Sequence, residues 1–368
     1  MTLYNQDRIV SADKVDIKPV FVDRYQKIMG DRYNEYIKFS FTYLRKCIRV
    51  NTLKTDVETI KNTFENQGWV LTPVPWCKEG FFVEGHKTLD RFDIGNVVEH
   101  TLGHFYVQEA ASMLPPVVLF GDLNKRRYSG EDIKEELSEL KVLDLCAAPG
   151  SKTTQLAMYM ENEGLLIAND VDVSRLKPLT MNLQRMGVTN ALVTMNAFQK
   201  SKNSTKPRNP FLHFNSQNEL VQTLDENGEP LAFDRILVDA PCSGTGTIRR
   251  SFKMMGMYSY GLVNRLVRIQ KDLIQHAFTM LKPGGLMVYS TCTQEPAENE
   301  AVVSYLLDKQ ESAEIVPIEL DIVRSPAITE FENLKIRPET KDCLRIYPQD
   351  NDTEGFFVTL IRKKLPNE

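Results

Sequence analysis

Two cysteines stand in similar settings fifty positions apart, each at the end of a strand-like run of apolar residues. Cys242 lies in "DAPCSGTGTIRR" (239–250), and Cys292 lies in "YSTCTQEPAENE" (289–300). Polar, turn-rich sequence follows each of them, and parallel strands would bring both thiols to one edge of a sheet. This placement favours chemistry over the commonest fate of a cysteine, which is to be a buried core thiol.

A thiol beside a methyl donor suits the methylation of a pyrimidine. Carbon 5 of the ring is a poor nucleophile, and addition of a thiolate to carbon 6 turns the ring into a reactive enamine. Cysteine supplies a strong nucleophile near neutral pH. An acid must support the N3 and amino edge of the ring, and Asp239, three residues before Cys242, can reach that edge. A second thiol could help to release the adduct, but spacing does not say which cysteine attacks.

A loop of small residues offers a place for the methyl donor. The segment "CAAPGSK" comprises Cys146, Ala147, Ala148, Pro149, Gly150, Ser151 and Lys152. It follows an apolar strand and opens a helix, whose free N–H groups favour a carboxylate or phosphate. It matches neither the dinucleotide fingerprint nor the Walker A loop. Asp170 ends the next strand, where an acid accepts hydrogen bonds from ribose hydroxyls. Together these features describe S-adenosylmethionine, although Asp170 could instead be a helix N-cap or a surface acid.

Alternating strands and helices after Leu140 provide the elements that position these residues. The runs "LKVLDLCAA", "LLIAND", "ALVTMN", "FDRILVDA" and "LMVYSTC" are strand-like, and helical segments separate most of them. This order predicts an α/β fold, with a Rossmann-like, doubly wound parallel sheet. The segment "DCLRIYPQDNDTEGFFVTLIRKK" predicts a further pair of strands near the C-terminus.

The organisation predicts two domains. Residues 1–100 contain small helices and a strand, helix, strand pattern, which indicates a small α+β module. Residues 101–368 form the catalytic domain of this interpretation, with 199–232, which are polar and poor in hydrophobic residues, as an exposed insertion.

Composition narrows the class of protein. The chain has 368 residues, of which 42% are hydrophobic, and no apolar run approaches the length that spans a bilayer. The polar N-terminus is unlike a secretory signal, so a cytoplasmic location is expected. The six cysteines contain no C-x-x-C pair. His100 and His104 have metal-like spacing but no third ligand nearby, and no metal site is predicted.

The distribution of charge matters more than the net charge of −4. Residues 24–61 carry nine basic and four acidic side chains, and residues 240–294 carry seven basic and one acidic side chain. The two zones could form one footprint for a polyanion, although solvated helix faces are the simpler explanation of either alone. Arg249, Arg250 and Lys253 directly follow the Pro-Cys motif, so we expect them to contact phosphates.

The motifs resemble those of the Nol/Nop/Sun family of RNA 5-methylcytosine methyltransferases. The similarity rests on "YVQEAASM", "LDLCAAPGSKT", "AND…R", "DAPCSGTG" and "YSTC…PAENE", in this order, and covers roughly residues 45–365. The arrangement is nearest to archaeal tRNA enzymes of that family. The resemblance implies a methyltransferase fold that uses S-adenosylmethionine, with a small N-terminal RNA-binding module.

The resemblance also implies roles for individual residues. Cys292 would be the nucleophile, Cys242 would help release, and Asp239 would contact the target cytosine beside the cofactor. Residues 146–152 would hold the methionine part of the cofactor, and Asp170 and Arg175 its ribose. The family usually has an acid near the adenine amino group where this chain has Asn196.

Several functions remain open at this point. tRNA is the favoured substrate, and the target base must leave its stack to reach a thiol. An rRNA methyltransferase of the same family is one alternative, and a non-catalytic RNA-binding or ribosome-assembly factor is another. A DNA methyltransferase, which would attack through Cys242, is the weakest alternative.

Overall fold

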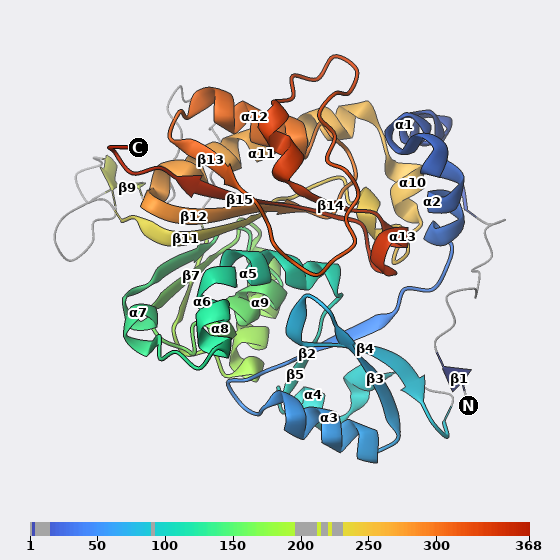
Figure 1. Ribbon diagram of the computed structural model, residues 1–368, viewed down its shortest axis with the longest axis vertical. Coiled ribbons are helices and arrows are strands. Elements are labelled where there is room, and N and C mark those ends of the chain that lie inside the picture. The colour runs from blue at the N-terminus through green and yellow to red at the C-terminus, as the bar shows by residue number, and fades with distance from the viewer. Residues whose placement is uncertain (1, 4–14, 90–92, 196–211, 215–219, 223–230) are drawn as a thin grey trace.

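The computed structural model contains two large sheets with helices around them, and a separate two-stranded sheet (Figure 1). It describes residues 2–3, 15–89, 93–195, 212–214, 220–222 and 231–368. The predicted insertion at 199–232 falls mostly outside these residues, as does Asn196. Within it the structure describes two short antiparallel strands, β9 (Leu212–Phe214) and β10 (Leu220–Gln222). Among the described helices, none is long and apolar enough to cross a membrane.

The larger sheet has the order β13-β15-β12-β11-β6-β7-β8, with β14 beside β15. Five neighbouring strands of this sheet, β12, β11, β6, β7 and β8, are mutually parallel. Strand β15 runs antiparallel between β12 and β13. The strands are β6 (Lys141–Asp144), β7 (Leu165–Asn169), β8 (Ala191–Thr194), β11 (Phe233–Asp239), β12 (Leu281–Thr291), β13 (Ala313–Val316), β14 (Leu344–Ile346) and β15 (Phe356–Lys363). The predicted Rossmann-like sheet is therefore present, with an antiparallel addition at one side.

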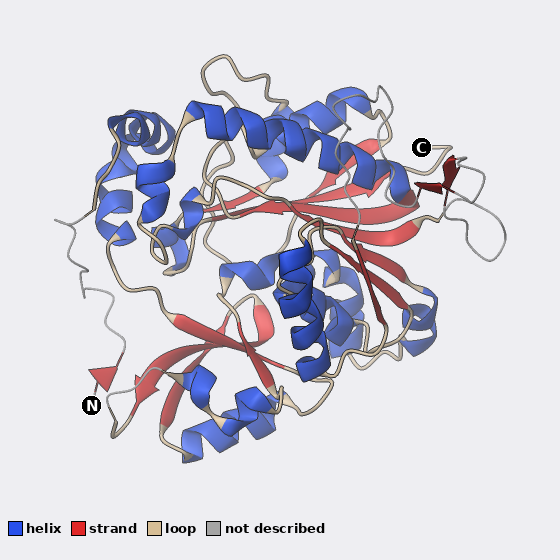
Figure 2. Ribbon diagram, turned by 180° about the vertical axis from the view of Figure 1, so that it is seen from behind, coloured by secondary structure: helices blue, strands red, loops and turns tan. Residues whose placement is uncertain are grey.

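Helices cover both faces of this sheet (Figure 2). Alternate side chains of a strand point to opposite faces, so Val142 packs in one apolar core and Leu143 in the other. The first core includes α5 (Leu114–Leu119) and α8 (Ser151–Tyr159), and the second includes α11 (Tyr260–Met280) and α12 (Glu300–Lys309). The other helices of this part are α6 (Gly121–Tyr128), α7 (Lys134–Glu139), α9 (Val173–Met186), α10 (Lys253–Met257) and α13 (Pro348–Asn351).

Local sequence signals set the ends of the helices that flank the site. The residue before α8 is Gly150, whose φ of 104° favours glycine. Asp172 caps α9 by accepting a hydrogen bond from the Ser174 N–H, and α9 ends at Gly187 with φ 74°. At the end of α11, β12 begins at Leu281, five residues before the start of the strand-like run "LMVYSTC". A shift in its register against β11 accommodates this early start.

The smaller sheet is antiparallel and forms the N-terminal part of the molecule. Its core holds Ile48, Phe64, Trp69 and Phe105, and α3 (Val57–Asn66) contributes Phe64. The strands are β1 (Thr2–Leu3), β2 (Lys46–Val50), β3 (Trp69–Val74), β4 (Cys77–His86) and β5 (Phe105–Val107), and α4 (Val98–Thr101) precedes β5. Because β5 pairs with β2, this sheet continues past residue 100. The predicted domain boundary between residues 100 and 101 stays a prediction.

The first two helices pack against the catalytic part rather than against the smaller sheet. In α1 (Pro19–Met29) and α2 (Tyr33–Ser40) the buried side chains share a core with α10 and the start of α11. The Tyr25 hydroxyl donates to Thr245 Oγ1, and Arg24 forms a buried ion pair with Glu295. Thr245 lies three residues after Cys242, and Glu295 three residues after Cys292. Helix α1 therefore contacts and stabilises the loops that follow both cysteines.

Candidate active site

A pocket of about 220 Å³ opens at the carboxyl ends of β6, β7, β11 and β12. This is the edge at which doubly wound sheets bind their ligands. Among the residues predicted from the sequence, those that line it are Cys146, Ala148, Asp170, Arg175, Asp239, Cys242 and Cys292. Val171 and Ile269 add apolar surface to its wall. The structure thus collects residues from four separate loops around one space.

The two cysteines meet in this pocket. Their Sγ atoms are 3.3 Å apart, and each thiol is half-buried and free. The contact follows from the sheet, because β11 and β12 pair in parallel with Asp239 opposite Ser290. Cys292 directly follows β12 and Cys242 comes three residues after β11. The hydrogen bond to Cys292, together with burial, raises the pKa of the Cys242 thiol well above its ordinary value.

Asp239 is held by a hydroxyl and an ammonium group. The Ser290 hydroxyl donates to its Oδ1 at 2.8 Å, and Lys152 Nζ donates to its Oδ2 at 2.7 Å. Burial lowers the pKa of Lys152, but the charge and hydrogen bond of Asp239, together with the charges of Cys292 and Asp144, outweigh burial, and the pKa is raised. The charge of a Cys292 thiolate acts on Lys152 in the same direction. Lys152, predicted to bind the cofactor, therefore lies beside the acid and near Cys292.

The loop at 146–152 is tied to the end of β7. The Ala148 N–H donates to Asp170 Oδ2 at 3.1 Å, and the Arg175 guanidinium donates to the Ala148 carbonyl. Asp170 is 3% exposed, whereas the side chain of Arg175 is 50% exposed. Burial, followed by the charges of Asp144 and Asp170, raises the pKa of the Cys146 thiol. Cys146 therefore keeps its proton and is unsuited to nucleophilic attack.

The remaining residues of this loop have structural positions. Ala147 is buried against α9 in a small apolar cluster, while Pro149 is exposed. Ser151 is the first residue of α8, and its carbonyl accepts a hydrogen bond from Arg49 at 2.8 Å. This bond connects the smaller sheet to the start of the helix that carries Lys152.

The position of Arg249 corrects one expectation about phosphate contacts. Its side chain is 0% exposed and forms an ion pair with Asp352, and it donates to the carbonyl of Thr353. A guanidinium in this position serves the packing of the C-terminal segment and does not reach a phosphate. Arg250 and Lys253 differ, since the side chain of Arg250 is 61% exposed, where it pairs with Glu354, and Lys253 is exposed.

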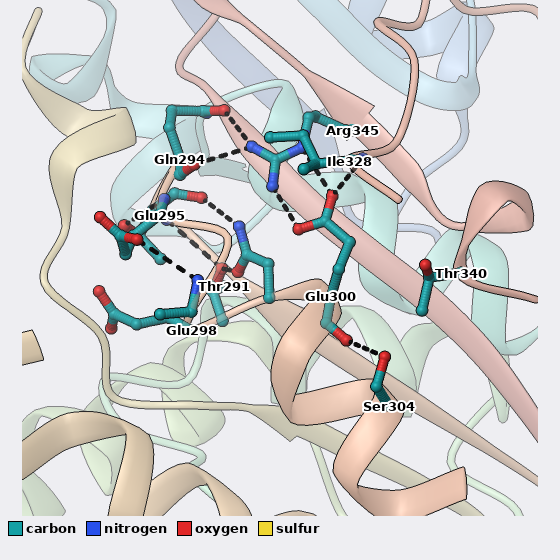
Figure 3. A network of polar contacts seen from close by, with 12 residues as sticks. Thr291, Gln294, Glu295, Glu298, Glu300, Ser304, Ile328, Thr340 and Arg345 are labelled. Atoms are coloured by element: carbon teal, nitrogen blue, oxygen red, sulfur yellow. Dashed lines mark hydrogen bonds and ion pairs between the residues drawn. The ribbon is translucent and has the colours of Figure 1, made fainter. Parts of the chain in front are cut away.

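A buried ionic network supports the loop that follows Cys292 (Figure 3). Arg345 on β14 donates from Nη2 to Glu300 Oε2 at 2.6 Å, and both side chains are 0% exposed. Arg345 also donates to the Gln294 carbonyl, and Asn299 donates to the Thr293 carbonyl. In the sequence, the motif "PAENE" supported the family resemblance and predicted no role for its acids. In the structure its second acid, Glu300, is the interior partner of Arg345 in the network that holds the cysteine loop.

Replacement of Arg345 by methionine is expected to lower the free energy of unfolding by about 3–5 kcal/mol, because it leaves the Glu300 carboxylate buried without its partner. Urea unfolding followed by circular dichroism measures the change. The matched control is Arg337→Met, which removes the ion pairs of an exposed guanidinium with Glu339 and Asp308 and should leave the unfolding midpoint unchanged. An unchanged midpoint for Arg345→Met as well would contradict the role given to this pair.

Comparison with known proteins identifies the family. Residues 133–362 match the family model of the 16S rRNA methyltransferases RsmB/F, which is more than half of the chain. The chain belongs to this RsmB/F methyltransferase family. Residues 17–110 match the model of the N-terminal domain of 16S rRNA methyltransferase RsmF. The resemblance that the sequence motifs indicated is confirmed.

Relatives within the RsmB/F family carry two kinds of name. A tRNA (cytosine(49)-C(5))-methyltransferase from Pyrococcus abyssi is 41% identical over 94% of this chain and 96% of its own length. Ribosomal RNA small subunit methyltransferase F from Vibrio parahaemolyticus is 39% identical over 95% of this chain, which spans only 64% of that relative.

Solved structures confirm the Rossmann-like methyltransferase fold. A methyltransferase homologue from Pyrococcus horikoshii has a TM-score of 0.71 and 33% identity, over 94% of this chain and 95% of that one. NSun6 from the same organism, solved with SFG, has a TM-score of 0.70 over 94% and 98% of the two chains. At 20% identity, the second comparison concerns the fold alone.

Proposed function

We propose that this chain is an S-adenosylmethionine-dependent RNA cytosine-5 methyltransferase that acts on tRNA through a covalent cysteine adduct. The observation that carries the proposal is the pair of thiols 3.3 Å apart, beside Asp239 and Lys152, in a pocket at the carboxyl edge of the sheet. The names of the relatives support RNA and carbon 5 of cytosine as the target.

The groups around Cys292 suit the role of the nucleophile. Lys152 is its neighbouring cation, whereas the pKa of the Cys242 thiol is raised by the hydrogen bond to Cys292 and by burial. Attack forms a bond from Cys292 Sγ to carbon 6 and places an electron pair on the ring. At the end of the reaction, the carbon-5 proton leaves to a base and the sulfur–carbon bond breaks, which restores the thiolate. Cys242 is placed to assist this release.

Asp239 suits recognition of the ring edge. Its two oxygens are fixed by Ser290 and Lys152, so the carboxylate does not need to reorganise when a base enters. A carboxylate has about four lone-pair sites, and these two bonds leave capacity for the cytosine amino group. Lys152 can follow the developing charge on the ring because it is a flexible cation.

The donor set around the pocket fits S-adenosylmethionine. Asp170 already accepts N–H donors from Ala148 and Asp172, and its remaining lone pairs suit ribose hydroxyls. Arg175 lies beside it, and Val171 offers an apolar surface for an adenine ring. The loop at 146–152 would receive the methionine part at the start of α8. When bound, the cofactor supplies an electrophilic methyl group.

The substrate RNA must present an unstacked cytosine, because the pocket is too small for a duplex and the ring face must meet the thiol. Arg250 and Lys253 on the surface after the Cys242 loop would contact the RNA backbone. tRNA is favoured over rRNA because the relative named as a tRNA enzyme matches this chain over nearly its whole length. An rRNA substrate is the second candidate, supported by the relatives named ribosomal RNA methyltransferase F.

Methyl transfer to defined RNAs tests this substrate assignment. The purified chain, with a labelled methyl donor, is expected to modify unmodified tRNA transcripts at single cytosines, which bisulfite sequencing locates. Transcripts with that cytosine changed to uridine serve as the control. Methylation of 16S rRNA alone would replace the tRNA assignment by the rRNA one, and methylation of neither would reject the proposed function.

A further inference from the structure

A buried carboxylate lies behind Cys242. Glu298 is 0% exposed, and its Oε2 accepts hydrogen bonds from the Ser243 N–H at 2.9 Å and from Gln270 Nε2 at 2.8 Å. Its Oε1 accepts no hydrogen bond from any residue that the structure describes. Gln270 also donates to the Pro241 carbonyl at 2.9 Å. Glu298 is thus fixed to the residues on both sides of Cys242, and the proposed chemistry has not used it.

Glu298 is separate from the ionic network of Arg345. Figure 3 shows its carboxylate turned away from the Glu300–Arg345 pair, to which it makes no hydrogen bond. The titratable groups that act on it are Cys242, Glu295 and Tyr289. Glu295 is neutralised by Arg24, and the Tyr289 hydroxyl donates to the Glu298 backbone carbonyl. Among the described residues no cation pairs with the Glu298 carboxylate, which is held at the backbone of Ser243 and contributes to the raised pKa of the Cys242 thiol.

The two thiols consequently lie in opposite electrostatic surroundings. Cys242 is subject to the negative charge of Glu298, and Cys292 to the positive charge of Lys152. A negative charge disfavours a thiolate nearby, and a positive charge favours one. Two thiols 3.3 Å apart do not both ionise readily, because like charges at this distance repel strongly. The charge of Glu298 thus adds to the hydrogen bond and the burial that oppose loss of the Cys242 proton.

We propose that Glu298 is a positioning residue that keeps the proton on Cys242 and so leaves Cys292 as the nucleophile. The proposal deepens the proposed function and rests on it for the meaning of the two roles. Cys292 loses its proton to solvent. Cys242 retains its S–H bond, which donates a hydrogen bond to the Cys292 sulfur. No electron transfer and no further reactant are needed.

The effect should depend on pH. Burial raises the pKa of Glu298 to about 7, opposed by the hydrogen bonds from Ser243 and Gln270. The carboxylate is therefore neutral in mildly acidic solution and becomes charged as the pH rises through neutrality. Its influence on Cys242 then grows over the same range of pH.

Alkylation of Cys242 tests the proposal without RNA or cofactor. In a Cys292→Ala background, the rate of reaction of Cys242 with iodoacetamide is measured by peptide mass spectrometry from about pH 6 to about pH 9. Addition of Glu298→Gln is expected to accelerate alkylation about tenfold on the alkaline side, equivalent to a fall of one unit in the pKa of Cys242. The matched control is Glu311→Gln, which removes an exposed carboxylate and should leave the rate unchanged. An equal rate with and without Glu298→Gln would overturn the proposal.

A second measurement keeps Glu298 in place, so its result does not depend on whether the Glu298→Gln variant folds. With Glu298 present, the logarithm of the alkylation rate should rise with a slope below one as the carboxylate ionises near neutral pH. A single titration of unit slope would contradict the proposal. Because neither measurement involves methyl transfer, a failure here is distinct from a failure of the methyltransferase function.

Discussion

Cys292→Ala is expected to reduce methyl transfer by about 10⁴-fold or more, because the ring loses the nucleophile that activates carbon 5. The thiol lies at the end of β12, within 3.3 Å of Cys242 and in the field of Lys152. Burial raises the pKa of the Cys47, Cys77, Cys146 and Cys343 thiols, so these four cysteines are unsuited to attack. Initial rates with a labelled methyl donor measure the loss.

A matched control for this variant is Cys343→Ala. It removes a buried thiol from the apolar core under α11 and α12, away from the pocket. Some stability is lost in this variant, but the rate per folded molecule should remain that of the wild type. If Cys292→Ala stays active while Cys242→Ala is inactive and forms no adduct, the two roles are exchanged.

Cys242→Ala is expected to accumulate a covalent complex between protein and RNA. Attack by Cys292 does not require the second thiol, whereas release of the adduct does in the proposed scheme. The complex should appear as a slowly migrating band on a denaturing gel when RNA and the methyl donor are both present. In the wild type this band should be faint, because release follows attack.

The double variant Cys242→Ala with Cys292→Ala provides the control, and it should form no such band. Absence of the band from Cys242→Ala, with a wild type that methylates the same RNA, would reject the assignment of Cys242 to release. Survival of the band in the double variant would mean that another residue makes the bond.

The parallel sheet and the location of the site were predictable because both depend on local patterns. Apolar runs followed by small or polar residues marked β6, β7, β11 and β12, and the carboxyl ends of parallel strands meet at one edge. The contact between Cys242 and Cys292 is a direct result of that rule. The family and fold are confirmed by the comparisons. The roles of the individual site residues stay predictions.

Long-range pairing was not predictable from local patterns. Arg249 belongs to a basic run next to the site, yet its partner Asp352 lies 103 residues further along the chain. Lys152 was grouped with the cofactor loop, because nothing in the sequence shows that Asp239, 87 residues away, is its partner. The insertion of β15 between β12 and β13 is of the same kind. Each of these contacts depends on how distant segments pack.

The support of the Cys292 loop by β14 and β15 has a consequence for how the protein is made. Arg345 anchors that loop from β14, and β15 pairs along the whole end of β12, with Phe357 opposite Thr291. On a ribosome, β14 and β15 emerge after Lys152, Asp239, Cys242 and Cys292. A nascent chain that already contains both thiols therefore still lacks the two strands that hold the Cys292 loop in place.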